Sequence, residues 1–186
     1  WLFFSSALSD VSNSIIGNGH LISKVYFPRL IIPLSSLLVS TVDFMITFSL
    51  LFLVMAWFSF IPSWHIIFIF YYILLTILIA FGLGLWAAAL NVRFRDFRHL
   101  IPFVLQLGVY VSPVGYSAQV VPEKWRLLYS LNPIVGVIEG FRWSIIGGEF
   151  TIYWPALMIS TVISFVLVIS GILYFRKTEA TFVDVI

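Results

Sequence analysis

The stretch that decides the fold is Gly17-Asn18-Gly19-His20-Leu21-Ile22-Ser23-Lys24-Val25-Tyr26-Phe27-Pro28-Arg29-Leu30-Ile31-Ile32-Pro33. It is polar, whereas the sequence on either side of it is too apolar to belong in water. Its glycines and asparagine are typical of a helix end, and Pro28 and Pro33 prevent one helix from running through. Residues 20–27 have the spacing of about two helical turns with an apolar face. We therefore predict that the chain reverses here, with a short helix along a membrane surface.

The composition is that of a membrane protein. Of the 186 residues, 61% are hydrophobic and 10% are charged, against roughly 45–50% and about 25% in soluble domains. The chain begins at Trp1, inside an apolar run, so we expect a single membrane domain over 1–186 that is truncated at its N-terminus. The lack of cysteine excludes disulfides and thiol chemistry. A net charge of +2 is too small to indicate a nucleic-acid partner.

Five segments are predicted to span the membrane, which needs roughly 20 apolar residues. They are Trp1–Ile16, Ile31–Ile61, Ile66–Leu90, Leu100–Ser117 and Trp154–Phe175. The fourth is short, with Pro102 expected in its first turn and Pro113 at a kink or at its end. The predicted fold class is therefore an all-α, polytopic membrane protein with about five spanning helices in this chain.

Residues 118–150 follow a different pattern. Ile134–Ile146 is apolar over too few residues to cross a bilayer. We predict two short re-entrant or interfacial helices joined around Asn132-Pro133, because such backbone at membrane depth must be covered by protein or line a wet cavity. Glu139 and Arg142, at positions i and i+3, are expected to pair with each other rather than to bind a ligand.

Loop charges predict the orientation. One set of loops carries seven basic residues and the other carries three, so the positive-inside rule places the first set in the cytoplasm. The cytoplasmic set is Lys24, Arg29, Arg93, Arg95, Arg98, Arg176 and Lys177; the external set is Lys124, Arg126 and Arg142. The C-terminus is then cytoplasmic and residues 118–150 are external.

The sequence offers little for catalysis. None of the 11 glycines is followed by lysine, which excludes a Gly-x4-Gly-Lys phosphate loop and ATP hydrolysis by that route. His20, His65 and His99 form no metal-binding motif, so no metal or other cofactor is expected in this chain. Asp10 and Asp43 lie within apolar segments, where a charge costs about 2.5–3.5 kcal/mol at the centre of a span. A structural acid facing the bundle and a proton or substrate site both remain open for them.

Aromatic residues make up 18% of the chain. Most of them cluster near the ends of predicted spans, as in an interfacial belt. They are Trp57, Phe58, Phe60, Trp64, Tyr71, Tyr72, Trp125, Tyr129, Trp143, Tyr153 and Trp154. Tyr110 and Tyr116 instead lie beside Gly108, Pro113 and Gly115 in a kinked span. There they are candidates for lining a passage in which rings stack on sugars.

Three stretches together resemble the permease subunits of type-2 ABC exporters, in particular those that export polysaccharide, O-antigen, capsule or teichoic acid. They are Leu21-Ile-Ser-Lys-Val-Tyr-Phe-Pro-Arg29 with Pro33, Asn91-Val-Arg-Phe-Arg-Asp96, and Tyr129-Ser-Leu-Asn-Pro133 followed by Gly140-Phe-Arg142. The resemblance covers essentially the whole chain. Family members have six spans preceded by an amphipathic interface helix, so this chain would hold spans two to six.

The resemblance implies a non-enzymatic permease in a bacterial inner membrane. It implies a homodimer on two cytoplasmic ATP-binding subunits, which would hold the ATP and Mg²⁺, and a lipid-linked glycan as substrate. Residues His20, Leu21, Ile22, Ser23, Lys24, Val25, Tyr26, Phe27, Pro28 and Arg29 would form the coupling helix that contacts the ATPase. The external helices would gate the exit, with Tyr110, Tyr116, Trp125, Tyr129, Glu139 and Arg142 as channel or gate candidates.

Three alternatives remain at the sequence level. Exporters of drugs or other small amphiphiles share this architecture. An ion-coupled secondary transporter would use Asp10 and Asp43 as its key groups. A membrane enzyme acting on lipid-linked substrates needs convergent histidines, acids or nucleophiles at one depth, and the sequence does not present such a set.

Overall fold

The computed structural model describes residues 1–22, 27–94, 96–147, 152–179 and 182, and this part of the chain contains helices and no strand. The α-helices are α1 (Leu2–Gly17), α2 (Gly19–Ile22), α3 (Ile31–Trp57), α4 (Ile69–Arg93), α5 (Phe97–Val111), α6 (Glu123–Tyr129), α7 (Pro133–Ile146) and α8 (Trp154–Thr178). Two 3₁₀ turns, η1 (Trp64–Phe68) and η2 (Ala118–Val120), lie between them. The predicted all-α class is confirmed.

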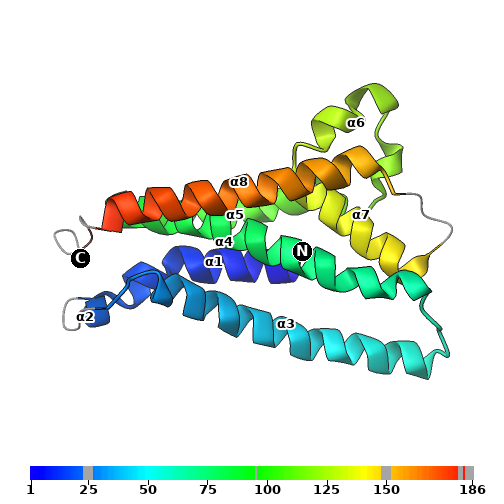
Figure 1. Cartoon of the computed structure of the whole chain (residues 1–186), viewed down its shortest axis with the longest axis horizontal. Coiled ribbons are helices and arrows are strands. Elements are labelled where there is room, and N and C mark those ends of the chain that lie inside the picture. The colour runs from blue at the N-terminus through cyan, green and yellow to red at the C-terminus, as the bar shows by residue number, and fades with distance from the viewer. Residues whose placement is uncertain (23–26, 95, 148–151, 180–181, 183–186) are drawn as a thin grey trace.

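The long helices form a bundle around α4 (Figure 1). α1 and α3 lie on one side of α4, and α8 runs along the other side. Gly82 lets α4 and α8 approach backbone to backbone, because a Cβ there would lie 2.6 Å from the carbonyl carbon of Leu167. Small residues at such crossings are typical of helices packed in a membrane, where close contact replaces the hydrophobic effect.

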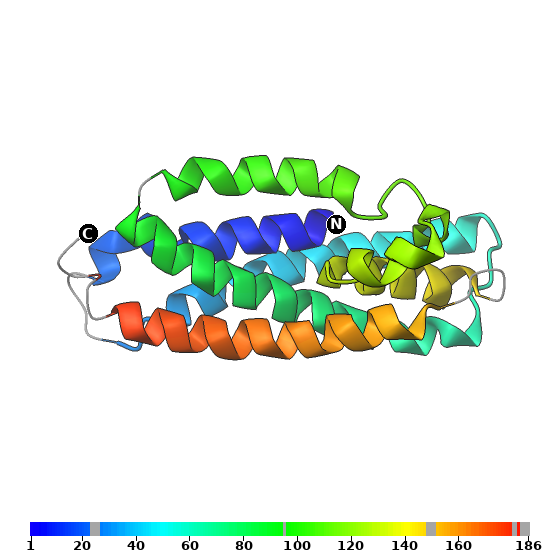
Figure 2. The same ribbon diagram turned by 90° about the horizontal axis from the view of Figure 1, so that it is seen from above.

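Three segments are long and apolar enough to cross a membrane: Ile31–Trp57, Trp64–Arg93 and Trp154–Thr178. The other two predicted spans are shorter, with 16 residues in α1 and 15 in α5, or about 24 and 22 Å at 1.5 Å per residue. Both lie alongside α4 in the bundle (Figure 2). α5 begins three residues before the predicted start, so Pro102 lies inside the helix rather than in its first turn. The helix ends at Val111, and Pro113 follows it.

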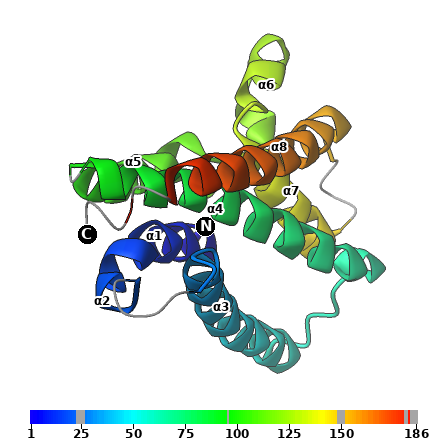
Figure 3. The ribbon, with the colours of Figure 1, turned by 60° about the vertical axis from the view of Figure 1, so that its left-hand side comes forward.

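The bundle has two distinct ends, the hinge end and the far end. α2, residues 27–33, the end of α4, the start of α5 and the end of α8 lie at the hinge end (Figure 1). The connection from α3 to η1, the start of α8 and the end of α7 lie at the far end. α6 projects sideways from the bundle in two views (Figures 1 and 3). All the segments that the sequence predicts to be cytoplasmic therefore share one end.

At the far end, Trp57, Trp64 and Trp154 of the predicted aromatic belt are exposed. Tyr72 does not belong to it, because only 2% of this residue is exposed. Its ring packs over Gly140 of α7, where an added Cβ would lie 2.1 Å from a ring carbon. Tyr72 is therefore a core residue that joins α4 to α7, and the belt assignment was wrong for this position.

Candidate functional site: a hinge and a polar gate

The hinge joins α1 to α3 in antiparallel directions. α1 ends at Gly17, and α2 is a single turn that begins at Gly19. Residues 23–26 of the predicted coupling helix lie outside the described part of the chain. The expected helix over residues 20–27 is wrong at Phe27, which has no helical assignment. Pro33 does not break a helix either, because it lies in the first turn of α3, where no intrahelical N–H is required.

The described side chains of the hinge divide into two groups. His20 and Leu21 are exposed, as is Pro28. Phe27 instead packs, partly buried, against a core cluster at the hinge end that includes Ile15 and Phe175. Its described contacts are therefore within the bundle, whereas Leu21 is the exposed apolar side chain of α2. Phe182 is fully buried in the same cluster, so the chain folds back onto the bundle after α8.

Arg29 lies in the turn before α3 and has an unusual guanidinium. Its Nη1 atom is buried and has no hydrogen-bond partner among the described residues. A buried donor without a partner costs about 1–3 kcal/mol, and more when it is charged.

An ion pair dominates the far end. Nη1 of Arg142 lies 2.6 Å from Oε1 of Glu139, and both side chains are mostly buried on α7. The backbone N–H of Ala118 donates to the same carboxylate oxygen at 3.0 Å, and Nη2 of Arg142 donates to the carbonyl of Pro113 at 3.0 Å. The pairing expected from the i, i+3 spacing is present. It also fastens the segment between α5 and α6 to α7, which the spacing does not reveal.

Two further contacts fasten the same segment. The hydroxyls of Tyr116 and Tyr129 lie 2.8 Å apart, and Nδ2 of Asn132 donates to Oγ of Ser112 at 3.0 Å. Burial raises the pKa of Tyr129, and its hydrogen bond with Tyr116 raises that pKa further. A tyrosine is already neutral at physiological pH, and the raised pKa of Tyr129 keeps the proton of this contact in place at higher pH as well. We call this set of contacts, from Ser112 to Arg142, the polar latch.

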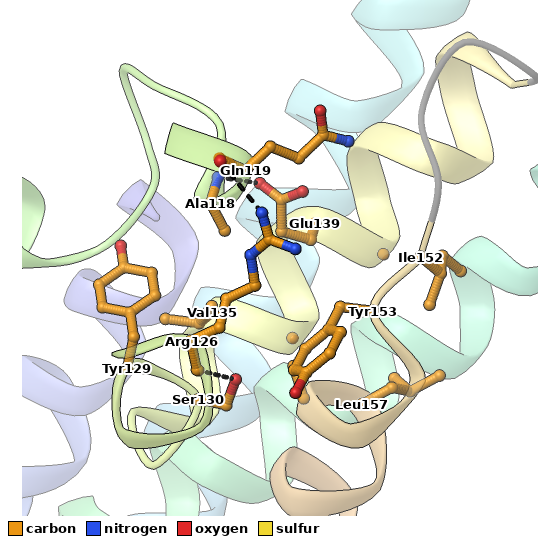
Figure 4. A pocket seen from close by; sticks show the side chains of 13 residues that line it. Ala118, Gln119, Arg126, Tyr129, Ser130, Val135, Glu139, Ile152, Tyr153 and Leu157 are labelled. Carbon is orange, nitrogen blue, oxygen red and sulfur yellow. Dashed lines mark hydrogen bonds between the residues drawn. The ribbon is translucent and has the colours of Figure 1, made fainter. Parts of the chain in front are cut away.

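A small pocket lies inside the polar latch (Figure 4). Arg126 and Glu139 line it together with Tyr129 and Tyr153. The side chain of Arg126 donates to the carbonyls of Val121 and Gln119 at 3.3 and 3.2 Å. The pocket volume of about 30 Å³ is enough for one or two waters, which need about 10–15 Å³ each. The latch is thus closed in this structure. Arg126 was not predicted as a site residue from the sequence. Its partners are backbone carbonyls, which every residue has, so no pattern of side chains indicates these contacts.

The remaining channel and gate candidates lie outside the latch pocket. Trp125 of α6 is exposed. Tyr110, at the end of α5, is 76% exposed, and its carbonyl accepts a hydrogen bond from the Tyr116 hydroxyl at 3.2 Å. The structure therefore brings Tyr116, Tyr129, Glu139 and Arg142 together. It leaves the ring of Tyr110 facing away from the bundle.

The two intramembrane acids differ in their contacts. Oγ of Ser40 donates to Oδ2 of Asp10 at 2.7 Å, so Asp10 ties α1 to α3. Asp43 is exposed, and no described residue donates to its carboxylate. It is the thirteenth residue of the 27-residue α3, so it lies near the middle of this helix. The hydroxyls of Thr41 and Thr47 donate to backbone carbonyls instead.

The described residues contain no metal-binding cluster of three or more acids and histidines. His20 and His99 are exposed at the hinge end, and His65 packs against Trp143 with ring centroids 4.2 Å apart. The described chain therefore has two candidate sites: a hinge that exposes Leu21, and a closed polar latch at the opposite end.

The sequence was compared with those of known proteins. The chain is 26% identical over 190 aligned positions to an O-antigen export system permease protein, RfbA, of Klebsiella pneumoniae, which covers all of this chain and 71% of that protein. A protein of the same name from Myxococcus xanthus is 25% identical over 76% of this chain and 55% of its own length. The inner membrane transport permease YadH of Escherichia coli K12 is 38% identical over 34% of this chain and 25% of its own length. The family model for the ABC-2 type transporter matches residues 1–146, and the chain therefore belongs to the ABC-2 type transporter family.

Proposed function

We propose that this chain is the membrane permease of an ATP-driven exporter that moves a lipid-linked polysaccharide, such as O-antigen, across the inner membrane of a bacterium. The observation that carries the proposal is the similarity over the full chain to permeases named for O-antigen export, joined to membership of the ABC-2 type family. The permease works as a homodimer with two cytoplasmic ATP-binding subunits. Those subunits hold the ATP and Mg²⁺, and this chain performs no hydrolysis.

The hinge end faces the cytoplasm in this proposal. Five of the eight Lys and Arg residues that the structure describes belong to segments at that end, in accord with the positive-inside rule. The ATP-binding subunit contacts the hinge through the exposed Leu21. Arg29, half-buried in the turn before α3, adds positive charge beside this contact. Motion of that subunit reaches α1 and α3 because both helices are continuous with the hinge.

The polar latch is the external gate of the exporter. Its contacts join the end of α5, the segment before α6 and the start and middle of α7. A polymer leaving beside these helices requires the contacts to separate. Their hydroxyls, carboxylate and guanidinium are also groups that can hydrogen-bond passing sugar hydroxyls. Tyr110 offers an exposed ring for stacking at the same depth.

The test removes the permease from cells of the source organism and restores it from a plasmid. Loss of surface glycan, its accumulation inside and recovery on restoration are expected. The same loss is expected when the phosphate-loop lysine of the partner ATPase is replaced, which separates an ATP-driven exporter from an ion-coupled one. Normal surface glycan with lost drug tolerance would instead favour the drug-exporter alternative. The short match to the transport permease YadH does not favour that alternative, because it covers only 34% of the chain.

A further inference from the structure

In the proposed exporter, motion of the hinge has to cross the bundle to reach the polar latch. The hinge is continuous with α1 and α3, whereas the contacts of the latch lie between the end of α5, α6 and α7 near the other end (Figure 1). α7 packs against both α4 and α8. The route therefore depends on side chains that join the hinge to α4 and α8.

An apolar cluster of buried side chains joins the hinge to both helices. The end of α1, the start of α3, the last turns of α4 and the end of α8 contribute to it, and Phe27 and Leu30 of the hinge pack against it. We call it the hinge-end cluster. Its buried members are Ile15, Ile32, Leu85, Ala88, Ala89, Val92, Phe175 and Phe182. The hinge therefore rests on α4 and α8 as well as being continuous with α1 and α3.

Phe182 is the member of the hinge-end cluster that lies beyond the end of α8. That helix ends at Thr178, yet Phe182 is fully buried. Its ring meets the ring of Phe175 edge-on, with 5.3 Å between the ring centroids. A buried aromatic ring removes roughly 150–250 Å² of surface from water. Phe182 thus fills the cluster on which the hinge rests and fixes it to the end of α8.

α4 and α8 are in direct backbone contact and form one stiff unit. A Cβ on Gly171 of α8 would lie 2.6 Å from the carbonyl oxygen of Gly82 on α4. α7 joins this unit, because a Cβ on Gly136 would lie 2.8 Å from the carbonyl oxygen of Ala156 on α8. Close-packed contacts have low compressibility and transmit a displacement. A push on the hinge-end cluster therefore reaches α7, which carries the ion pair of the latch.

We propose that Phe182 is a positioning residue for energy coupling: it holds the hinge against α4 and α8, so that motion of the ATP-binding subunit is transmitted to the polar latch. The inference rests on the proposed function and adds a route through packed side chains to the covalent one through α1 and α3. Without this ring, the hinge moves over the cluster instead of moving with it. ATP hydrolysis then continues without opening the latch.

The experiment follows the opening of the latch with one cysteine, so it needs no identified substrate. Ser130→Cys places a thiol in the latch pocket (Figure 4), where Ser130 is only 1% exposed, and residues 1–186 contain no other cysteine. The permease is purified with its ATP-binding partner in lipid nanodiscs. Mass spectrometry measures how fast a hydrophilic maleimide labels this thiol with and without ATP and Mg²⁺. ATP should raise the rate at least fivefold, and Phe182→Ala should reduce this increase to less than twofold while ATP hydrolysis continues.

Leu75→Ala is the matched control for a loss of stability alone, because Leu75 is a fully buried residue of α4 in the other core cluster. It should lower the midpoint of thermal unfolding, as Phe182→Ala does, yet keep the increase with ATP. Phe182→Leu retains most of the apolar volume and should retain most of the increase. If Phe182→Ala does not assemble, Val92→Ala removes a smaller part of the hinge-end cluster and should still lower the increase about twofold.

The proposal is overturned if the increase with ATP survives Phe182→Ala, or if Leu75→Ala removes it to the same extent. No increase in the permease that carries only Ser130→Cys would overturn both this route and the gate role of the latch. Failure of the proposed function is distinguishable from either result, because the surface glycan of the cells would then not depend on the permease.

Discussion

The ion pair of Glu139 and Arg142 is expected to affect stability strongly because it is mostly buried. The two side chains are only 14% and 19% exposed. Glu139→Gln leaves the Arg142 charge without its partner and weakens the contact with Ala118. We expect a loss of about 3 kcal/mol in the free energy of unfolding, as for other broken buried pairs. The midpoint of thermal unfolding in detergent, followed by tryptophan fluorescence, measures it.

Glu123→Gln is the control for this prediction, since Glu123 is an exposed acid on α6. Replacing both partners, in Glu139→Gln/Arg142→Met, removes the unpaired charge and should recover part of the loss. Equal midpoints for Glu139→Gln and Glu123→Gln would show that the pair contributes nothing to stability.

Gly140 gives a second test at the scale of one residue. An added methyl group there would lie 2.1 Å from the Tyr72 ring, whereas nothing lies within 4 Å of one at Gly115. Gly140→Ala should therefore lower stability by about 1–3 kcal/mol through overpacking, and Gly115→Ala should not. The same thermal unfolding assay compares them. If Tyr72→Leu does not relieve the effect of Gly140→Ala, the cause is not this contact.

At the scale of elements, the sequence predicted the helices whose positions follow from a local pattern of residues. Long apolar runs identified α3, α4 and α8, and Asn132-Pro133 marked the start of α7, where Oδ1 of Asn132 accepts from the N–H of Ile134. The contacts that make a site were not predictable in this way. Glu139 meets Ala118 across 21 residues, and Asn132 meets Ser112 across 20, through partners that carry no spacing signal. Tyr72 was misassigned because a tyrosine near the end of a span has the same signature in a belt and in a core.

The hinge allows a prediction about the contact between α2 and the proposed ATP-binding subunit. Leu21→Ala should weaken association with the ATP-binding subunit about tenfold, or roughly 1.4 kcal/mol, because it removes an exposed apolar side chain from the contact surface. Phe27→Ala should instead lower the stability of the permease by about 2 kcal/mol, because Phe27 packs on its own bundle. Affinity by pull-down titration and thermal unfolding separate the two effects. The assignment fails if Phe27→Ala alone weakens association.

The orientation of the whole molecule can be tested with single cysteines, since residues 1–186 contain none of their own. Lys124→Cys lies on the projecting α6, and Arg98→Cys lies at the hinge end. With a membrane-impermeant thiol reagent on cells whose outer membrane has been made permeable, Lys124→Cys should react at once. Arg98→Cys should react only after the inner membrane is opened. The reverse pattern would invert the proposed topology.

In the proposed homodimer, transport is expected to depend on side chains that the single chain leaves uncovered. Tyr110 is 76% exposed on α5 and contributes no ring contact to the described bundle. In a channel between two permeases, this ring exchanges the hydration of a sugar for stacking, without holding any one unit tightly. Tyr110→Ala should therefore slow glycan export severalfold at an unchanged midpoint of unfolding. Phe165→Ala, at a 54% exposed aromatic of α8, should leave export normal because that face contacts lipid. Surface glycan per permease molecule is the measurement, and equal export by the two variants would remove Tyr110 from the channel wall.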